Sequence, residues 1–366
     1  MARRVVFLIT DLDLGGGPLV VRRIGRGLRQ AGPWRPTVVS LKPSGVVGTL
    51  LRHDDVEVVS LQARHPADAG VGYRWLRLLN RIRPEVVVSV LFHANALAAA
   101  AAPLGPPCVY LQSVHTLQPT PRWHWVLQGL LAGRGEGVIA PSRAILRHLE
   151  TYGSFAAGYV VPNGVDVETL ARAAPIPPEK RPWPPGARVV GCVGRFDPVK
   201  QIDRLVRAMA WLWRGDYARH QAVYLALIGY GPAERQLRAL ARELGCASHV
   251  ALPGPTLTPE HWYKCIDVLC VPSRVEGFGL TLIEAMAAGV PVLAFSGGAT
   301  AEIVEHGVTG YLVDFQRPHA LAEGLEILLG DSALRRRLAE AGQRTARQRF
   351  SSEQMVAGYT NILNSF

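Results

Sequence analysis

The sequence contains few lysines and few cysteines, only four and five among its 366 residues. The cysteines stand singly, with no C-x-x-C pair and no histidines at ligand spacing, which argues against a zinc site or a dithiol redox site. A reduced, cytoplasmic chain is the simplest interpretation. The chain also lacks internal repeats and low-complexity tracts. Ordered, globular domains are therefore expected along its whole length.

A long apolar run is also missing. Residues 86–121 contain no Asp, Glu, Lys or Arg, but prolines and a glycine interrupt them. A helix that spans a bilayer needs about 20 unbroken apolar residues, so this stretch predicts a strand, a short helix and a strand in a buried parallel sheet. The apolar run 5–10 is too short for a signal peptide and predicts the first strand.

Positive charge dominates, with 40 Lys and Arg against 29 Asp and Glu, a net charge of +11. Most of the surplus lies in the first half, where Arg22, Arg26 and Arg29 recur at helical spacing and form one basic face. Such a face fits an anionic membrane or a phosphorylated acceptor. The alternative is a solvated helix in an arginine-rich chain. Peripheral attachment to the inner face of a membrane therefore stays open, and no nucleic-acid partner is expected.

Short β-rich runs alternate with helical patterns along the chain, which predicts βαβ units and parallel sheets. Residues 173–187 hold six prolines in fifteen residues, a density that excludes helix and central strand. We therefore expect two Rossmann-like α/β domains whose strand-end loops face a central cleft. The predicted strands are 5–10, 36–41, 86–91, 108–112, 138–140 and 159–161, then 189–193, 224–228, 250–252, 268–271, 291–295 and 310–313.

Two strand-to-helix turns carry features that suit phosphate. "DLDLGGGPLVV" places Gly15, Gly16 and Gly17 before a helix, where free backbone N–H groups bind anions. It is neither a Walker loop nor G-x-G-x-x-G, and a plain tight turn explains it nearly as well. "GCVGRFDPVKQID" places Arg195 and Lys200 at the end of a strand, before a helix expected to start near residue 199. Two cations at such a position suit a diphosphate.

The stretch "SRVEGFGLTLIEAMAAGVPVLAFSGG" contains two carboxylates, Glu276 and Glu284. A glycine turn at Gly277 and Gly279 is expected to leave Glu276 on the rim, with Glu284 inside a helix over 280–288. On one continuous helix the two would be about 12 Å apart, too far for the acid–base pair of a retaining hydrolase. They are better suited to two parts of one elongated ligand, such as the sugar and the ribose of a nucleotide-sugar.

These residues resemble the E-x7-E signature of the retaining glycosyltransferases of family 4, which have the GT-B fold. The blocks "GRFDPVKQID", "LIGYGPAERQL" and "HVALPG" stand in the family's order, and "VIAPSRAILRHL" and "VVPNGVD" match as well. The ending "RFSSEQMVAGYTNIL" resembles the helix that in this fold crosses back to the first domain. The resemblance implies an acceptor-binding domain at 1–173, a linker at 174–187, a nucleotide-sugar domain at 188–350 and that final helix at 351–366.

The resemblance also implies a role for each site residue. Arg195 and Lys200 neutralise the donor diphosphate, and Glu276 meets the donor sugar. His115, in "LQSVHTLQP", matches a histidine that faces the donor sugar, although a structural loop histidine is an alternative. The donor-binding residues that it implies are Gly16, Gly17, Phe278, Gly279, Leu280, Thr281 and Glu284.

The implied reaction is transfer of a hexose, with retention, from a nucleoside-diphosphate sugar to a glycan or lipid-linked acceptor that the sequence leaves unidentified. A UDP-sugar is favoured and GDP-mannose comes second. We expect no metal and no cofactor beyond this co-substrate, because the one D-x-D, Asp11 and Asp13, lies in the glycine loop. A sugar-nucleotide 2-epimerase and a non-catalytic nucleotide-sugar-binding subunit are the alternatives.

Overall fold

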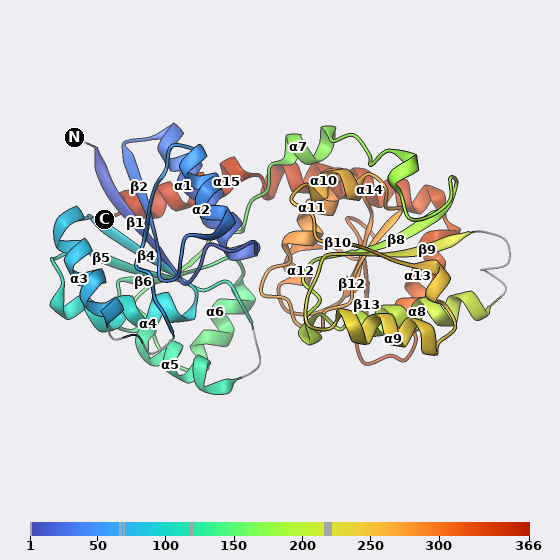
Figure 1. The fold of residues 1–366 in the computed structure, drawn as a ribbon, viewed down its shortest axis with the longest axis horizontal. Helices are drawn as coiled ribbons and strands as arrows, with labels where there is room; N and C mark the ends of the chain where they lie inside the picture. The colour runs from blue at the N-terminus through green and yellow to red at the C-terminus, as the bar shows by residue number, and fades with distance from the viewer. Residues whose placement is uncertain (1, 66–67, 69, 118–120, 216–221) are drawn as a thin grey trace. The chain divides into compact units, whose positions relative to one another are not determined.

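The chain folds into two compact units, each an α/β layer structure (Figure 1). The computed structural model describes residues 2–65, 68, 70–117, 121–215 and 222–366. Unit 1 comprises Met1–Gly164 and Ser351–Phe366, and unit 2 comprises Val165–Phe350. Within the described ranges, no helix is long and apolar enough to cross a membrane.

Unit 1 is built on a seven-stranded parallel sheet of order β3-β2-β1-β4-β5-β6-β7. The apolar runs 5–9 and 86–90 in its two central strands are buried, as expected in a parallel sheet. Helices α1 and α15 cover one face, and α3, α4 and α5 cover the other (Figure 1). The strands are β1 (Arg3–Ile9), β2 (Trp34–Ser40), β3 (Glu57–Ser60), β4 (Val86–Val90), β5 (Val109–Ser113), β6 (Gly137–Ala140) and β7 (Gly158–Val160). The helices are α1 (Gly16–Ala31), α2 (Gly45–His53), α3 (Gly70–Ile82), α4 (Phe92–Ala101), α5 (Arg122–Ala132), α6 (Arg143–Glu150) and α15 (Ser352–Asn364).

The C-terminal helix α15 packs in unit 1, as the GT-B resemblance implies. It lies against α1, where Gly27 allows close approach because any side chain there would clash with Val356. The indole Nε1 of Trp34 donates to the side-chain oxygen of Asn364 at 2.9 Å. Residues from both ends of the chain therefore build this unit.

Unit 2 contains a six-stranded parallel sheet of order β10-β9-β8-β11-β12-β13. One core cluster packs α8, α9 and α13 on one face, and a second packs α7 and α11 on the other. The strands are β8 (Arg188–Val193), β9 (Val223–Ile228), β10 (Val250–Gly254), β11 (Val268–Val271), β12 (Val292–Phe295) and β13 (Tyr311–Val313). The helices are α7 (Val167–Arg172), α8 (Ile202–Arg214), α9 (Glu234–Glu243), α10 (Pro259–Tyr263), α11 (Leu280–Ala288), α12 (Thr300–Ile303), α13 (Ala320–Gly330) and α14 (Ser332–Arg349).

The division between the units lies earlier in the chain than 173. Unit 2 begins at Val165, and α7 packs against α11. The proline-rich segment 174–187 is also part of this unit, because Trp183 is buried in its core and contacts Trp262. The segment, which the structure describes in full, contains no α-helix or strand and only a 3₁₀ turn at Pro178–Lys180, while the tryptophan between the prolines anchors it to the domain.

Two individual elements differ from the sequence-based prediction. All the strands predicted from the sequence form. The sequence did not predict β3, a short edge strand with no fully buried residue. A 3₁₀ turn over Pro198–Lys200 follows β8, so α8 starts at Ile202 rather than near 199. Gln201, in the left-handed conformation at φ 49°, separates the two.

Candidate functional site

A partly buried ion pair joins the loops that follow two neighbouring strands of unit 2. Lys200 comes after β8 and Glu276 comes after β11, and these strands are paired in the sheet. The Nζ of Lys200 donates to both carboxylate oxygens of Glu276, at 2.8 and 3.0 Å. Because parallel strands end at the same edge of a sheet, two residues 76 positions apart meet at the edge where ligands of such sheets bind.

Glu276 does not lie on the rim, contrary to expectation. Only 7% of the residue is exposed, whereas the Lys200 side chain is 37% exposed. A carboxylate without its hydration shell needs a compensating charge or hydrogen bond, and the ammonium group supplies both. Lys200 therefore holds Glu276 in position while part of its own surface stays open to solvent.

Arg195 is placed differently from Lys200. Its side chain is 69% exposed, and its Nε lies 3.8 Å from a carboxylate oxygen of Asp197. The same Asp197 accepts the backbone N–H of Val199 and so fixes the turn after β8. The two cations predicted for a diphosphate thus differ in environment, since one is committed to Glu276 and the other projects into solvent.

Helix α11 begins directly after the loop that carries Glu276. Gly279 is its N-cap at φ 105°, a conformation that favours glycine, and a side chain there would press on Leu282. Phe278 is buried and packs edge-on against Phe350. The first turn of a helix leaves backbone N–H groups without intrahelical partners, and Leu280 and Thr281 occupy that turn. The helix start therefore suits an anion.

Glu284 points its carboxylate into the interior of unit 2, where it meets a partner that the sequence did not reveal. It is 9% exposed, and its Oε2 accepts the hydroxyl of Tyr263 at 2.9 Å. Tyr263 ends α10 and is fully buried. Ser273, between β11 and Glu276, has a buried hydroxyl with no hydrogen-bond partner in the described part of the chain. Tyr263 lies outside every block quoted for the resemblance, whereas Ser273 opens the E-x7-E stretch but was not singled out.

Gly16 and Gly17 lie in unit 1 at the start of α1, as predicted. Gly15 caps the helix with extended backbone, so no left-handed turn is needed there. Gly16 is exposed, whereas a side chain at Gly17 would contact Leu91 at 3.5 Å. Leu91 directly follows the neighbouring strand β4 and has φ 72°, an uncommon conformation for a non-glycine residue. The glycine loop therefore leaves room beside a strained strand end.

His115 follows β5 in unit 1 and joins a short hydrogen-bond chain. Its Nε2 lies 2.9 Å from the hydroxyl of Ser113, which lies 3.1 Å from the hydroxyl of Tyr359 on α15. Its Nδ1 is buried and has no hydrogen-bond partner among the residues the structure describes. Burial lowers the pKa of His115 to about 4, so the imidazole is neutral near pH 7.

The basic face predicted on α1 is largely engaged inside unit 1. Arg22 forms two bonds with the carboxylate of Asp54, at 2.6 and 3.2 Å, just after α2. Arg29 donates to the backbone oxygen of Asp55 at 3.3 Å. These arginines tie α1 to the end of α2, which makes the face a poor choice for recruiting an anionic surface.

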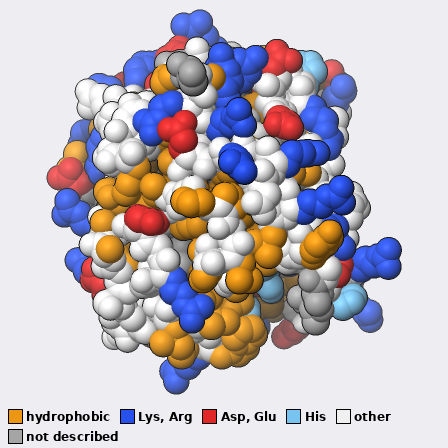
Figure 2. All heavy atoms as spheres, turned by 90° about the vertical axis from the view of Figure 1, so that its left-hand side faces the viewer, with side chains coloured by type: hydrophobic (Ala, Val, Ile, Leu, Met, Phe, Trp, Pro, Cys, Tyr) orange, Lys and Arg blue, Asp and Glu red, His pale blue; other side chains and the backbone are white. Residues whose placement is uncertain are grey.

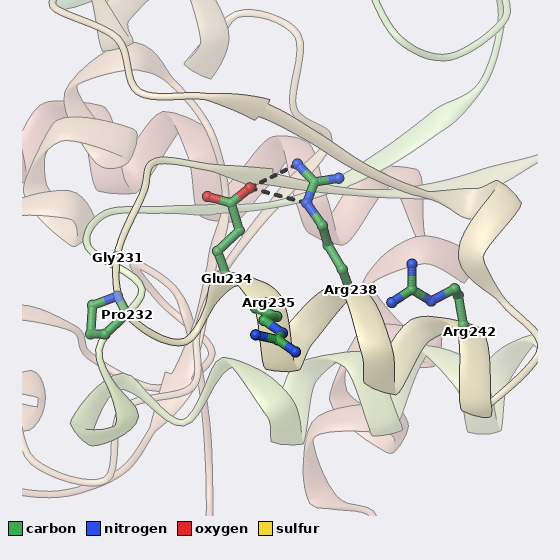
Figure 3. A pocket seen from close by; sticks show the side chains of 6 residues that line it. All are labelled: Gly231, Pro232, Glu234, Arg235, Arg238 and Arg242. Atoms are coloured by element: carbon green, nitrogen blue, oxygen red, sulfur yellow. Dashed lines mark hydrogen bonds and ion pairs between the residues drawn. The ribbon is translucent and has the colours of Figure 1, made fainter.

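A cavity of about 380 Å³ opens beside α9 in unit 2 and is lined by three arginines (Figure 3). The Glu234 carboxylate bonds to Arg238, at 2.8 and 3.0 Å, and three arginines against this one carboxylate give the lining a positive excess. None of the predicted site residues lines it. Its lining residues are Gly231, Pro232, Glu234, Arg235, Arg238 and Arg242. Across the described ranges, no group of three His, Cys, Asp or Glu side chains is arranged to hold a metal ion.

Solved structures share this fold at low sequence identity. HepE from Anabaena, in a crystal structure with UDP and glucose, superposes with a TM-score of 0.87 and 22% identity over 100% of both chains. Sucrose-phosphate synthase from Thermosynechococcus elongatus gives a TM-score of 0.84 and 22% identity over 99% of both chains. The two parallel sheets and these neighbours define the class of fold, which is GT-B.

Two family models cover most of the sequence. That of Glycosyltransferase Family 4 matches residues 14–169, and that of Glycosyl transferases group 1 matches residues 176–345. The chain belongs to the family 4 glycosyltransferases, as the resemblance of its E-x7-E stretch indicated.

Curated relatives match over part of their length. D-inositol 3-phosphate glycosyltransferase of Xylanimonas cellulosilytica is 34% identical over 56% of this chain and 50% of its own. The enzyme of the same name from Nocardia farcinica is 40% identical over 42% of this chain and 35% of its own. The matches to these relatives thus span half of their length or less.

Proposed function

We propose that this protein transfers a hexose from a nucleoside-diphosphate sugar to an acceptor hydroxyl and retains the anomeric configuration. The observation that carries the proposal is the Lys200–Glu276 ion pair at the strand ends beside the start of α11, in which Glu276 is buried and Lys200 is partly exposed. A carboxylate held by an ammonium group accepts hydrogen bonds from sugar hydroxyls, while the adjacent helix start favours phosphate.

Each predicted residue of unit 2 has a role in this proposal. Glu276 binds hydroxyls of the donor sugar, and Arg195, Lys200 and the N–H groups from Phe278 to Thr281 stabilise the diphosphate. Glu284 binds the ribose hydroxyls. For unit 1, we assign Gly16 and Gly17 to the donor phosphate and His115 to the donor sugar.

In the reaction, the bond between the anomeric carbon and the phosphate oxygen breaks and the acceptor oxygen bonds to the same face of that carbon. The acceptor proton passes to the leaving phosphate. Charge on the departing diphosphate rises as the bond breaks, so groups that bind it there lower the barrier. We propose that Arg195, Lys200 and the helix start supply this stabilisation without a metal ion or another cofactor.

A uridine nucleotide is the donor we favour, with a guanosine nucleotide second. Support comes from HepE, whose crystal structures contain UDP, UDP-glucose, or UDP with glucose. The names of the curated relatives make inositol 3-phosphate the first acceptor to try, before glycans and lipid-linked sugars.

The test is a thermal-shift series with UDP, UDP-glucose, GDP and GDP-mannose, followed by product analysis. Stabilisation by one nucleotide-sugar and an α-linked product from an α-linked donor support the proposal. An inverted linkage refutes retention. Release of nucleotide and a 2-epimeric sugar without any acceptor would identify the epimerase instead. Tight binding without turnover for every acceptor tried would favour a non-catalytic subunit.

A further inference from the structure

Helix α5 of unit 1 presents an apolar face to solvent. Trp123, Val126 and Leu130 are 57%, 47% and 66% exposed. Their spacing of three and four residues places them on one side of the helix. Isolated exposed apolar residues are ordinary, but three large ones in a continuous helical stripe mark a surface that binds something.

The inner side of α5 buries Trp125 and Leu131 together with one polar residue. Gln128 is buried; its side-chain oxygen accepts from Asn95 at 3.2 Å, and its amide donates to Gln112 at 2.6 Å. The amide of Gln112 then donates to the backbone oxygen of Leu131 at 2.7 Å. This network fixes the rotation of the helix, so the outward position of the stripe is set by the packing of unit 1.

The segment that carries the stripe has basic residues and no acidic ones. Residues 86–135, which include α4 and α5, contain no Asp or Glu. Their only Lys or Arg residues, Arg122 and Arg134, are both exposed and stand at the two ends of α5. In Figure 2, the lower part of the face of unit 1, the level at which α5 lies in Figure 1, carries a group of hydrophobic side chains with basic side chains near it.

We propose that α5 is a membrane-surface helix, which inserts Trp123, Val126 and Leu130 into the interface of an anionic bilayer. A short helix with an apolar face and basic ends lies in the plane of such an interface. Arginine stems extend along the apolar layer while their guanidinium groups meet the lipid phosphates. The lipid contact is therefore on α5, and the engaged arginines of α1 are not needed for it.

A second copy of this chain fits the same surface less well. A two-fold contact would pair α5 with itself, and an antiparallel pairing would bring Arg122 of one copy to Arg134 of the other. The like charges would repel, with no carboxylate on α5 to compensate. An anionic lipid surface neutralises the same groups.

The experiment is co-sedimentation of the full chain with phosphatidylcholine vesicles, with and without phosphatidylglycerol. We expect binding to the anionic vesicles only, and about tenfold weaker binding for Leu130→Glu. Leu257→Glu is the matched control, since Leu257 is 64% exposed in unit 2. It should bind like the wild type. Arg122→Gln should weaken binding to anionic vesicles about fivefold.

The position of the helix in the lipid is tested by fluorescence. Brominated lipids should quench part of the tryptophan emission of the wild type, and Trp123→Phe should remove most of that quenching. Circular dichroism and thermal midpoints establish that the variants fold. Equal vesicle binding by wild type and Leu130→Glu would overturn the proposal. So would a dimer in light scattering that Leu130→Glu dissociates, without any vesicle binding.

Discussion

The hydroxyl of Tyr263 lies 2.9 Å from the Oε2 of Glu284, and both side chains are buried in unit 2. Tyr263 comes from α10 and Glu284 from α11, so the bond fixes the carboxylate relative to a second helix. A hydrogen bond to a buried carboxylate contributes about 1.5–3 kcal/mol. The orientation of the proposed ribose ligand thus depends on a tyrosine outside every recognised motif.

Tyr263→Phe is expected to weaken UDP binding about tenfold, because Glu284 loses the bond that orients it. The measurement is isothermal titration with UDP and with its 2′,3′-dideoxy analogue. If Glu284 binds the ribose hydroxyls, the variant should lose affinity for UDP and change little toward the analogue. Tyr224→Phe, which alters a tyrosine of β9, is the control. Equal losses for both ligands would show that Tyr263 is only structural.

Substitutions of the two cations should separate activity from stability. Arg195→Ala and Lys200→Ala should each lower kcat/KM about 10–100-fold if both groups bind the diphosphate. Lys200→Ala should also lower the free energy of unfolding by about 1–3 kcal/mol, because it leaves the buried Glu276 without its counter-charge. Arg195→Ala should leave stability unchanged, since its side chain is largely exposed.

Urea denaturation of Lys200→Ala, Glu276→Gln and the double variant checks this coupling. The double variant should lose less stability than the sum of the two single variants. The neutral amide of Glu276→Gln needs no counter-charge, so removing Lys200 from that variant costs little. Additive losses would mean that the ion pair contributes nothing to holding Glu276. Wild-type turnover in Arg195→Ala or Lys200→Ala would show that the substituted residue does not bind the diphosphate.

Glu276→Ala should abolish sugar transfer while nucleotide binding survives. The proposed contact of Glu276 is with the sugar, and free UDP has none. Titration with UDP and with UDP-glucose decides between the roles, since only the second should lose affinity, by about tenfold or more. Loss of UDP binding itself would place Glu276 at the nucleotide instead.

The neutral state of His115 should appear as a pH dependence of stability. Its pKa is lowered to about 4 by burial from an ordinary value of 6.5, so between these values the unfolded chain binds the proton and the folded chain does not. The free energy of unfolding should therefore fall as the pH falls through this window. The loss at pH 5 relative to pH 7.5 is about 2 kcal/mol from this group.

Denaturation of wild type and His115→Asn at the two pH values isolates this contribution. The variant cannot titrate at this position, so its own loss should be smaller than that of the wild type by about the same 2 kcal/mol. Identical losses would show that the imidazole is protonated freely in the folded state.

Local signals predicted much of the fold. The bounds of α11 were correct because Gly279 and Gly289, both at positive φ, mark its two ends. Buried parallel strands were recognisable as apolar runs between turn residues. The edge strand β3 was missed because edge position leaves Glu57 exposed and its neighbours only half-buried. Such a segment carries a weak apolar signal.

For the candidate site, the sequence predicted residues but not the contacts between them, and the role of each residue stays a prediction. Its cations and carboxylates stand in motifs, whereas the burial of Glu276 depends on Lys200, which is distant in sequence. The bond from Tyr263 to Glu284 likewise depends on how α10 packs against α11. Long-range packing sets these features, and no local pattern encodes them.

The split composition of unit 1 has a consequence for biosynthesis. A ribosome delivers all of Val165–Phe350 before α15 emerges, so unit 2 is complete while unit 1 still lacks the helix that covers α1. Until then, Gly27 and the indole of Trp34 lack the contacts that they make with Val356 and Asn364 of α15. Unit 1 is thus translated first but completes its fold after unit 2. Until it does, the face of α1 that α15 covers is exposed and accessible to chaperones.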